Sequence, residues 1–160
     1  MLPSEQLIAD AADREAIAAK AKRISWEAGR LRWKLHADQR MVYDLIHASG
    51  SGRFVMEIAR RWGKSFLLTL IAVETCLRKP HTRVVYAAPT LKALQEFILP
   101  AFAAVCEDAP PSCRPVWNEK SGHMTFPNGS WVHLFGAENK LTADRGRGSE
   151  AALAIGDESA

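Results

Sequence analysis

Three consecutive residues in the middle of the chain, Gly63, Lys64 and Ser65, have the chemistry needed to hold a phosphate group. An apolar run at residues 53–58 precedes them and a second apolar segment at residues 66–77 follows, which predicts a strand, a loop and a helix. A helix N-terminus offers unpaired backbone N–H groups to an anion. A lysine at this place reaches nucleotide phosphates, and the serine hydroxyl ligates Mg²⁺.

The loop departs from the usual pattern G-x-x-x-x-G-K-[ST], because Ile58 stands where the first glycine is expected. Gly-Lys-Ser alone is a common tripeptide that also occurs in ordinary loops, so an acidic partner is needed. Asp157 and Glu158 follow a short apolar strand at residues 152–156 and supply a candidate. Asp157 would hold Mg²⁺ through its water shell, and Glu158 would orient or deprotonate the attacking water. Phosphoryl transfer needs both parts.

Three further polar residues are open to two interpretations each. Gln39 lies upstream of the loop, where its amide could reach an adenine edge, but the residues alone favour a surface glutamine on a first helical turn. Arg145 and Arg147 lie in a polar, glycine-rich stretch at residues 136–150. Such a stretch can direct an arginine at a phosphate or serve as a flexible connection, and composition does not decide between them.

The elements around these residues can be placed from periodicity and from helix signals. Residues 4–35 are predicted to be mostly helical, with Gly29 as a possible break, and Asp38 is predicted to cap a second helix. Pro80 should stop the helix after the loop, and residues 84–88 form a buried-type strand. Strand, helix and strand make a βαβ unit, which predicts a parallel sheet.

The second half of the chain carries one strong turn signal. Thr90 is predicted to cap a helix that Pro100 interrupts, and residues 107–122 are predicted to form a loop. Residues 124–126 and 130–135 flank an Asn-Gly turn, which predicts a β-hairpin. His133 is then expected to be a half-buried strand residue and not a catalyst.

Composition sets wide bounds on function. The 160 residues are 48% hydrophobic and 24% charged with a net charge of +3, which fits an ordinary globular protein and requires no nucleic-acid partner. Three cysteines without a CxxC pattern argue against a disulfide framework and favour a reducing compartment. Cys113, His123 and His133 are too far apart for a standard zinc module, and no apolar run would cross a membrane.

Basic residues gather between positions 20 and 40, where they form either a phosphate-facing patch or a solvated helix face. They are Lys20, Lys22, Arg23, Arg30, Arg32, Lys34 and Arg40.

The order of these motifs resembles a known family. Gln39, the loop Arg60–Arg61–Trp62–Gly63–Lys64–Ser65, Ala-Ala-Pro-Thr, the hairpin, Arg-Gly and Asp-Glu follow one another as in the N-terminal ATPase domain of the large terminase subunit of tailed bacteriophages. The resemblance covers about residues 33–160. That family often lacks the first loop glycine and carries an arginine three positions before the second one, where this chain has Arg60.

The resemblance implies a fold and a set of site residues. The fold would be α/β, a P-loop NTPase of the class with an additional central strand and a catalytic glutamate, with a parallel sheet flanked by helices and a β-hairpin insertion. An N-terminal helical arm would span residues 1–36 and a partial ATPase domain residues 37–160. Gln39 would sense adenine, Ser65 and Asp157 would hold Mg²⁺, and Glu158 would be the catalytic carboxylate. The remaining contacts to ATP would come from Ala59, Arg60, Arg61, Trp62, Gly63 and Lys64.

Arginines complete the implied site. Arg147 is similar to an arginine that reaches the ATP of a neighbouring subunit, with Arg145 as its rival, and Arg60 is a candidate for sensing the γ-phosphate within the subunit. By family, the partners would be double-stranded DNA, the small terminase subunit, the portal protein and other copies of the chain in a ring. The motor would drive DNA packaging into proheads in the cytoplasm of a bacterial host, without a membrane.

Two departures from the family pattern are visible. Gly156 stands where a bulky apolar residue is usual, and the chain stops two residues after Glu158. The family continues there with further strands and a nuclease, so we expect an ATPase domain incomplete at its C-terminus. Nucleotide contacts are expected to be encoded, turnover and packaging to be impaired in this chain alone, and nuclease activity to be absent.

Two alternatives remain at the level of sequence. A DEAD-like helicase or translocase also carries Ala-Ala-Pro-Thr and Asp-Glu, but its loop usually keeps the first glycine. A non-catalytic remnant could use the basic helical region at residues 4–35 to bind DNA or a protein partner.

Overall fold

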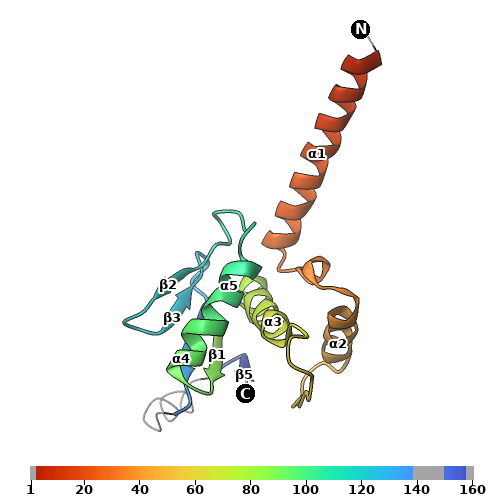
Figure 1. The fold of residues 1–160 in the computed structure, drawn as a ribbon. Coiled ribbons are helices and arrows are strands. Elements are labelled where there is room, and N and C mark those ends of the chain that lie inside the picture. Colours follow the sequence, from red (N-terminus) through yellow and green to blue (C-terminus); the bar gives the residue numbers. More distant parts are fainter. Residues whose placement is uncertain (1–2, 139–149, 158–160) are drawn as a thin grey trace.

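The computed structural model describes residues 3–138 and 150–157, with the side chains of residues 10–138 and 150–157. These residues form an α/β structure with a single five-stranded sheet of order β2-β3-β4-β1-β5 (Figure 1). Strand β1 pairs in parallel with β4 on one side and β5 on the other, whereas β2, β3 and β4 are antiparallel. The α/β class is confirmed, but the described sheet is mixed and not wholly parallel. The strands are β1 Arg83–Ala88, β2 Val116–Asn118, β3 His123–Thr125, β4 Trp131–Gly136 and β5 Leu153–Gly156.

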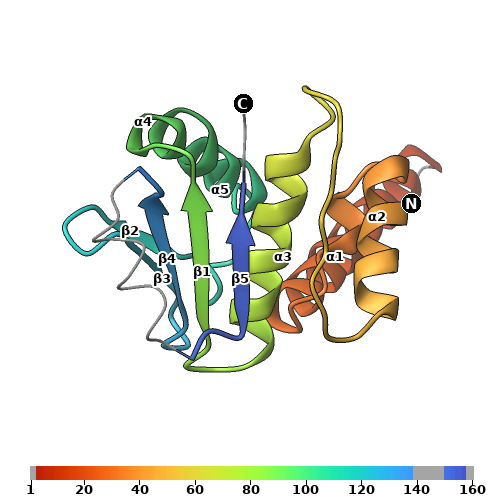
Figure 2. The same ribbon diagram turned by 90° about the horizontal axis from the view of Figure 1, so that it is seen from below.

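Helix α3 and the helical segment from α4 to α5 pack on one face of this sheet (Figure 2). Thr90 Oγ1 accepts a hydrogen bond from Ala93 N at 3.0 Å, so the predicted cap is confirmed. Pro100 lies in the first turn of α5, directly after a π-helical turn, which confirms the predicted interruption. The helices are α1 Pro3–Glu27, η1 Arg32–Lys34, α2 Ala37–Ala48, α3 Lys64–Arg78, α4 Leu91–Ala93, η2 Leu94–Ile98 and α5 Leu99–Val105.

Helix α1 extends away from the sheet, and only its C-terminal end joins the body of the molecule (Figure 1). It ends at Glu27, eight residues before the predicted boundary, because Gly29 adopts a left-handed conformation with φ +59°. The chain around this break is anchored by Trp26, Leu31 and Leu35, which are buried in the main core. The region predicted to be an arm therefore contributes core residues through its last part.

Two predictions for the chain before α3 are wrong, the cap of α2 and the strand at residues 53–58. His36, not Asp38, caps α2, because its Nδ1 accepts from Gln39 N while Gln39 Oε1 accepts from His36 N in a reciprocal capping box. Residues 53–58 run extended beside α3 but form no strand among the described residues (Figure 2). Both edges of β1 are already taken by β4 and β5, so this segment has no place beside β1, and Val55 is 89% exposed. The predicted βαβ unit is accordingly absent from the described sheet.

The predicted hairpin is confirmed, with Met124 opposite Val132 and Thr125 opposite Trp131. It is not an insertion set apart from the sheet, since β4 is the direct neighbour of β1. Its buried residues Val132 and Leu134 face the core, and His133 is half-buried as expected. The predicted loop at residues 107–122 is wrong in part, because β2 lies within it and pairs with β3.

Helix α3 is the central helix of the core, and its C-terminal end is held by the hairpin turn. Asn128 Nδ2 donates to the Cys76 carbonyl at 2.8 Å, and Ser130 Oγ donates to the Lys79 carbonyl at 3.0 Å. These bonds satisfy carbonyls that the end of a helix leaves unpaired. Cys76 is free and buried, like the other two cysteines, and burial raises the pKa of its thiol to about 12. No helix in the described part of the chain has the length and apolar character to cross a membrane.

A buried carboxylate in the same helix joins α3 to the N-terminal region. Glu74 is 1% exposed and accepts hydrogen bonds from Leu31 N, from Tyr43 Oη at 2.7 Å and from Arg78 Nη2 at 3.0 Å. Arg78 also donates to the Gly29 carbonyl at 2.9 Å. A buried charge is tolerated only when its lone pairs are satisfied in this way. Glu74 therefore fixes the positions of α2 and of the segment after α1 relative to α3.

We predict that Glu74→Ala lowers the free energy of unfolding by about 3 kcal/mol, because it breaks a buried network and leaves its donors unsatisfied. Urea denaturation followed by circular dichroism measures the loss. The matched control is Glu96→Ala, which removes the exposed i,i+4 partner of Lys92 and should cost about 0.5 kcal/mol or less. Equal losses for the two variants would contradict the role assigned to Glu74.

Acid should destabilise the hairpin through two histidines. The rings of His123 and His133 lie 5.1 Å apart, and burial lowers the pKa of both. A histidine with a lowered folded-state pKa takes up its proton more readily in the unfolded chain, so stability falls as the pH drops through the unfolded value, about 6.5. The midpoint of thermal unfolding should fall less between pH 7 and pH 5 in the variant His133→Gln than in the unmodified chain. An unchanged pH dependence would exclude this contribution.

Candidate functional site

The loop before α3 and the end of β5 meet at one edge of the sheet. Ser65 Oγ donates to Asp157 Oδ2 at 2.6 Å, and Lys64 Nζ lies 3.4 Å from Asp157 Oδ1. Asp157 follows β5 directly, and its residue is 1% exposed. Helix α3 starts where the parallel strands β1 and β5 end, so these residues converge although 92 positions separate Ser65 from Asp157 (Figure 2). A buried carboxylate is thus paired with a lysine and a hydroxyl, beside a helix N-terminus.

A third side chain reaches the same carboxylate from β1. Tyr86 is fully buried and its hydroxyl donates to Asp157 Oδ2 at 3.0 Å. Burial, and then the negative charge of Asp157, raise the pKa of Tyr86 far above its usual range, so its hydroxyl stays protonated. No sequence motif pointed to Tyr86, because a tyrosine in an apolar strand is normally interpreted as a core residue.

The loop before Lys64 has an unusual backbone. Arg61 and Gly63 both adopt positive φ angles, 66° and 91°, and Gly63 is the N-cap of α3. Ala59, Arg60 and Arg61 are exposed, while Trp62 is half-buried. A positive φ is uncommon for a residue with a side chain, so the left-handed Arg61 indicates a loop held in shape by its surroundings.

Helix α2 provides that support through its first turn. Gln39, 3% exposed, donates from Nε2 to the Gly63 carbonyl at 3.0 Å and accepts from His36 N at 3.2 Å. His36 Nδ1 accepts from Gln39 N, so its Nε2 carries the proton and donates to the Trp62 carbonyl at 3.2 Å. His36 was not a predicted site residue, although His-x-x-Gln has the spacing of a capping box. Gln39 is buried, so the interpretation as a surface glutamine is wrong; its amide binds loop backbone, and an adenine contact stays a prediction.

The structure brings together Gln39, Gly63, Lys64, Ser65 and Asp157, all of which were predicted site residues. The predicted catalytic Glu158 and the two arginines Arg145 and Arg147 lie outside the described residues. Among the residues that are described, no group of three or more histidine, cysteine or acidic side chains is arranged to hold a metal ion.

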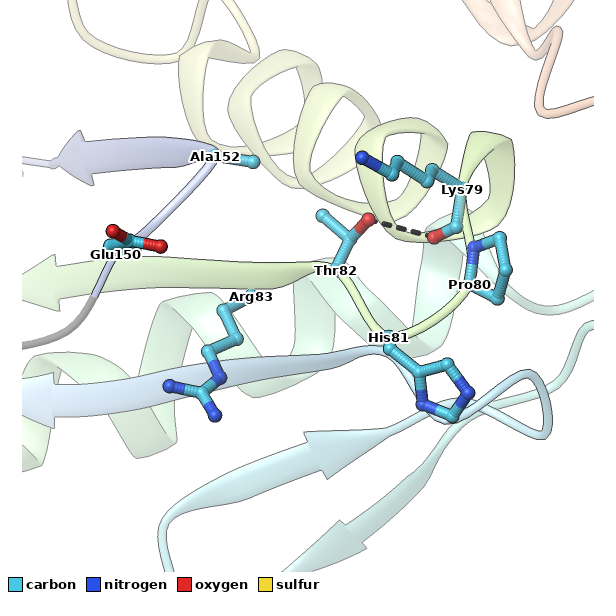
Figure 3. A pocket seen from close by; sticks show the side chains of 7 residues that line it. All are labelled: Lys79, Pro80, His81, Thr82, Arg83, Glu150 and Ala152. Atoms are coloured by element: carbon cyan, nitrogen blue, oxygen red, sulfur yellow. Dashed lines mark hydrogen bonds between the residues drawn. The ribbon is translucent and has the colours of Figure 1, made fainter.

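A hollow of about 420 Å³ lies at the opposite end of β1, far from Asp157 in the strand direction (Figure 3). It is lined by Lys79, His81, Arg83 and Glu150, with Thr82 Oγ1 donating to the Lys79 carbonyl at 2.7 Å. Since β1 begins at Arg83 and Asp157 bonds to Ala87 near its other end, the hollow is not part of the candidate site.

A comparison with protein families matches residues 55–160 to the model described as "Terminase large subunit, T4likevirus-type, N-terminal". The match begins at Val55, before the loop, and includes every strand of the sheet. The chain belongs to this terminase family. Terminase large subunits act in packaging phage DNA, which gives the chain a general role in a packaging motor. A comparison with curated proteins found no match.

The left-handed conformation of Gly63 gives a test of how Gln39 supports the loop before α3. A Cβ at this position would lie 2.5 Å from Gln39 Nε2, and φ is 91°. We predict that Gly63→Ala lowers the free energy of unfolding by about 1–3 kcal/mol, from strain and the displaced Gln39 side chain. Denaturant melts measure the difference.

Gly156 is the matched control. Nothing lies within 4 Å of a Cβ built there, and its φ is not in the left-handed region. Gly156→Ala should therefore leave stability unchanged within about 0.5 kcal/mol or raise it slightly, because alanine restricts the unfolded chain. A Gly63→Ala protein as stable as the Gly156→Ala protein would contradict the contact described for Gln39.

Proposed function

We propose that the chain is the ATP-binding and ATP-hydrolysing motor domain of a phage terminase large subunit, with a P-loop NTPase fold. The observation that carries the proposal is the convergence of Lys64 and Ser65 with the buried Asp157 at a helix N-terminus. Family membership supports the same assignment, since the matched region contains all three residues. The left-handed residues Arg61 and Gly63 add support, because backbone turns of this kind direct N–H groups into an anion-binding concavity.

The donor chemistry at this place fits Mg²⁺. Ser65 Oγ and Asp157 Oδ2 are hard oxygen ligands that already lie 2.6 Å apart, and Mg²⁺ in phosphate sites is held by few protein oxygens together with substrate phosphates. Bound there, the ion would neutralise charge developing on the β- and γ-phosphates. Lys64 would move its ammonium from Asp157 Oδ1 to a phosphate oxygen, and the N-terminus of α3 would stabilise the same charge.

The remaining roles rest on the resemblance to the family. Glu158 follows Asp157 directly and would orient or deprotonate the attacking water. Arg147, with Arg145 as rival, would reach the ATP of a neighbouring copy, and Arg60 would sense the γ-phosphate. Gln39 would sense adenine, and its hydrogen bond to the Gly63 carbonyl would link adenine binding to the backbone of the loop.

The partners proposed for the motor are double-stranded DNA, the small terminase subunit, the portal protein and further copies of the chain in a ring. ATP hydrolysis would drive DNA into the prohead inside the bacterial host.

The central test is nucleotide binding. We predict that Lys64→Ala weakens Mg²⁺-ATP binding by about 10- to 100-fold, because it removes a charged contact to the phosphates. Isothermal titration calorimetry on the 160-residue chain measures the affinity. Lys92→Ala, which removes an exposed lysine on α4, is the control and should bind ATP as the unmodified chain does.

Equal ATP affinity in the Lys64→Ala and Lys92→Ala proteins would refute the nucleotide site. Ser65→Ala distinguishes the contribution of the metal to ATP affinity from that of the phosphate contacts. It should reduce the gain in ATP affinity that Mg²⁺ gives, while metal-free ATP binding stays nearly intact.

A further inference from the structure

We propose that Tyr86 is a positioning residue for the metal-binding carboxylate: its buried hydroxyl holds Asp157 in the orientation that Mg²⁺ requires. The inference rests on the proposed function, because it assigns a role toward the metal of the same site. It starts from a contact that the loop motifs do not contain, the 3.0 Å hydrogen bond from Tyr86 Oη to Asp157 Oδ2.

The two oxygens of Asp157 have different partners. Oδ2 accepts from both Ser65 Oγ and Tyr86 Oη, whereas Oδ1 lies 3.4 Å from Lys64 Nζ. Ser65 and Lys64 both belong to the loop–helix junction and would change partners when a metal and phosphates bind. Tyr86 belongs to the sheet, so its bond can remain while the other two rearrange.

Tyr86 is well suited to hold a fixed position. It lies in β1, which is paired on both sides, opposite Leu134 of β4 and Ile155 of β5. Its side chain is 0% exposed, and its ring packs edge-on against Phe102 of α5 with the ring centroids 6.3 Å apart. A side chain with so little freedom fixes the rotation of the Asp157 carboxylate with little further loss of entropy.

The backbone supports the same arrangement. Asp157 N donates to the Ala87 carbonyl at 2.9 Å, so the residue next to Tyr86 also holds the main chain of Asp157. Main chain and side chain of Asp157 are therefore both fixed by β1. Loss of the Tyr86 hydroxyl would remove the hydrogen bond that ties the Asp157 side chain to β1, while its bonds to Ser65 and Lys64 involve groups that the metal and nucleotide displace.

The test compares ATP affinity with and without Mg²⁺ in Tyr86→Phe. The dissociation constant without Mg²⁺ divided by the one with Mg²⁺ measures how much the metal contributes to ATP affinity. A general loss of stability does not change this ratio in molecules that remain folded. We expect the ratio to fall by about 10- to 100-fold, as for loss of a hydrogen bond to a charged group that binds a metal, while metal-free ATP affinity stays the same.

The chain supplies its own matched control, because it contains two tyrosines and both donate to buried carboxylates. Tyr43 Oη donates to Glu74 Oε2 at 2.7 Å, away from Asp157. Tyr43→Phe should lower stability about as much as Tyr86→Phe and leave the Mg²⁺ ratio unchanged. A normal ratio in Tyr86→Phe, or an equal fall in both variants, overturns the proposal.

Failure of the proposed function gives a different result, since the unmodified chain would then show no ATP binding that depends on Lys64. If Tyr86→Phe does not fold, the native hydroxyl is probed instead. In Tyr43→Phe labelled with 3-fluorotyrosine, Tyr86 gives the single ¹⁹F signal. We expect that signal to shift with Mg²⁺-ATP and not with ATP alone, and an unshifted signal overturns the proposal.

Discussion

The burial of the Asp157 carboxylate is the constraint on which the site depends. A charge that is 1% exposed must be compensated by donors from its surroundings, and here these come from Lys64, Ser65 and Tyr86. These donors belong to α3 and β1, so satisfying one carboxylate fixes α3, β1 and the edge strand β5 against one another. The same requirement that stabilises the fold assembles the groups that phosphate chemistry needs.

A second buried carboxylate, Glu74, repeats this arrangement ten residues along the helix from Lys64. It fixes α2, and α2 in turn places His36 and Gln39 on the backbone of the loop before α3. Helix α3 therefore has one acidic contact at its functional end and another on the side facing the N-terminal region. The shape of the loop depends on both, although only the first belongs to the motif.

Sequence patterns predicted the parts of this structure that local forces decide. Helix α3, strand β1, the Asn-Gly hairpin and β5 all follow from periodicity and turn chemistry, whereas the pairing of Lys64 with Asp157 was predicted from what phosphoryl transfer needs. Residues 53–58 carry a strand pattern yet form no strand, because pairing depends on a partner that local sequence does not reveal. Tyr86 and Glu74 were missed for a related reason: their partners lie 71 and 43 positions away, and nothing in an apolar segment marks which polar residue will find one.

Helix α3 connects the loop at Gly63 to the hairpin turn as one rigid element. Its 15 residues span about 22 Å, from the N-cap Gly63 to the carbonyls that Asn128 and Ser130 hold at the far end. Because its backbone hydrogen bonds run along the axis without a break, the helix is stiff along its length. The position of the loop is therefore coupled through α3 to the Asn-Gly turn and to the hollow lined by Lys79, His81, Arg83 and Glu150. The loop and the hairpin turn therefore lie at the two ends of one stiff helix.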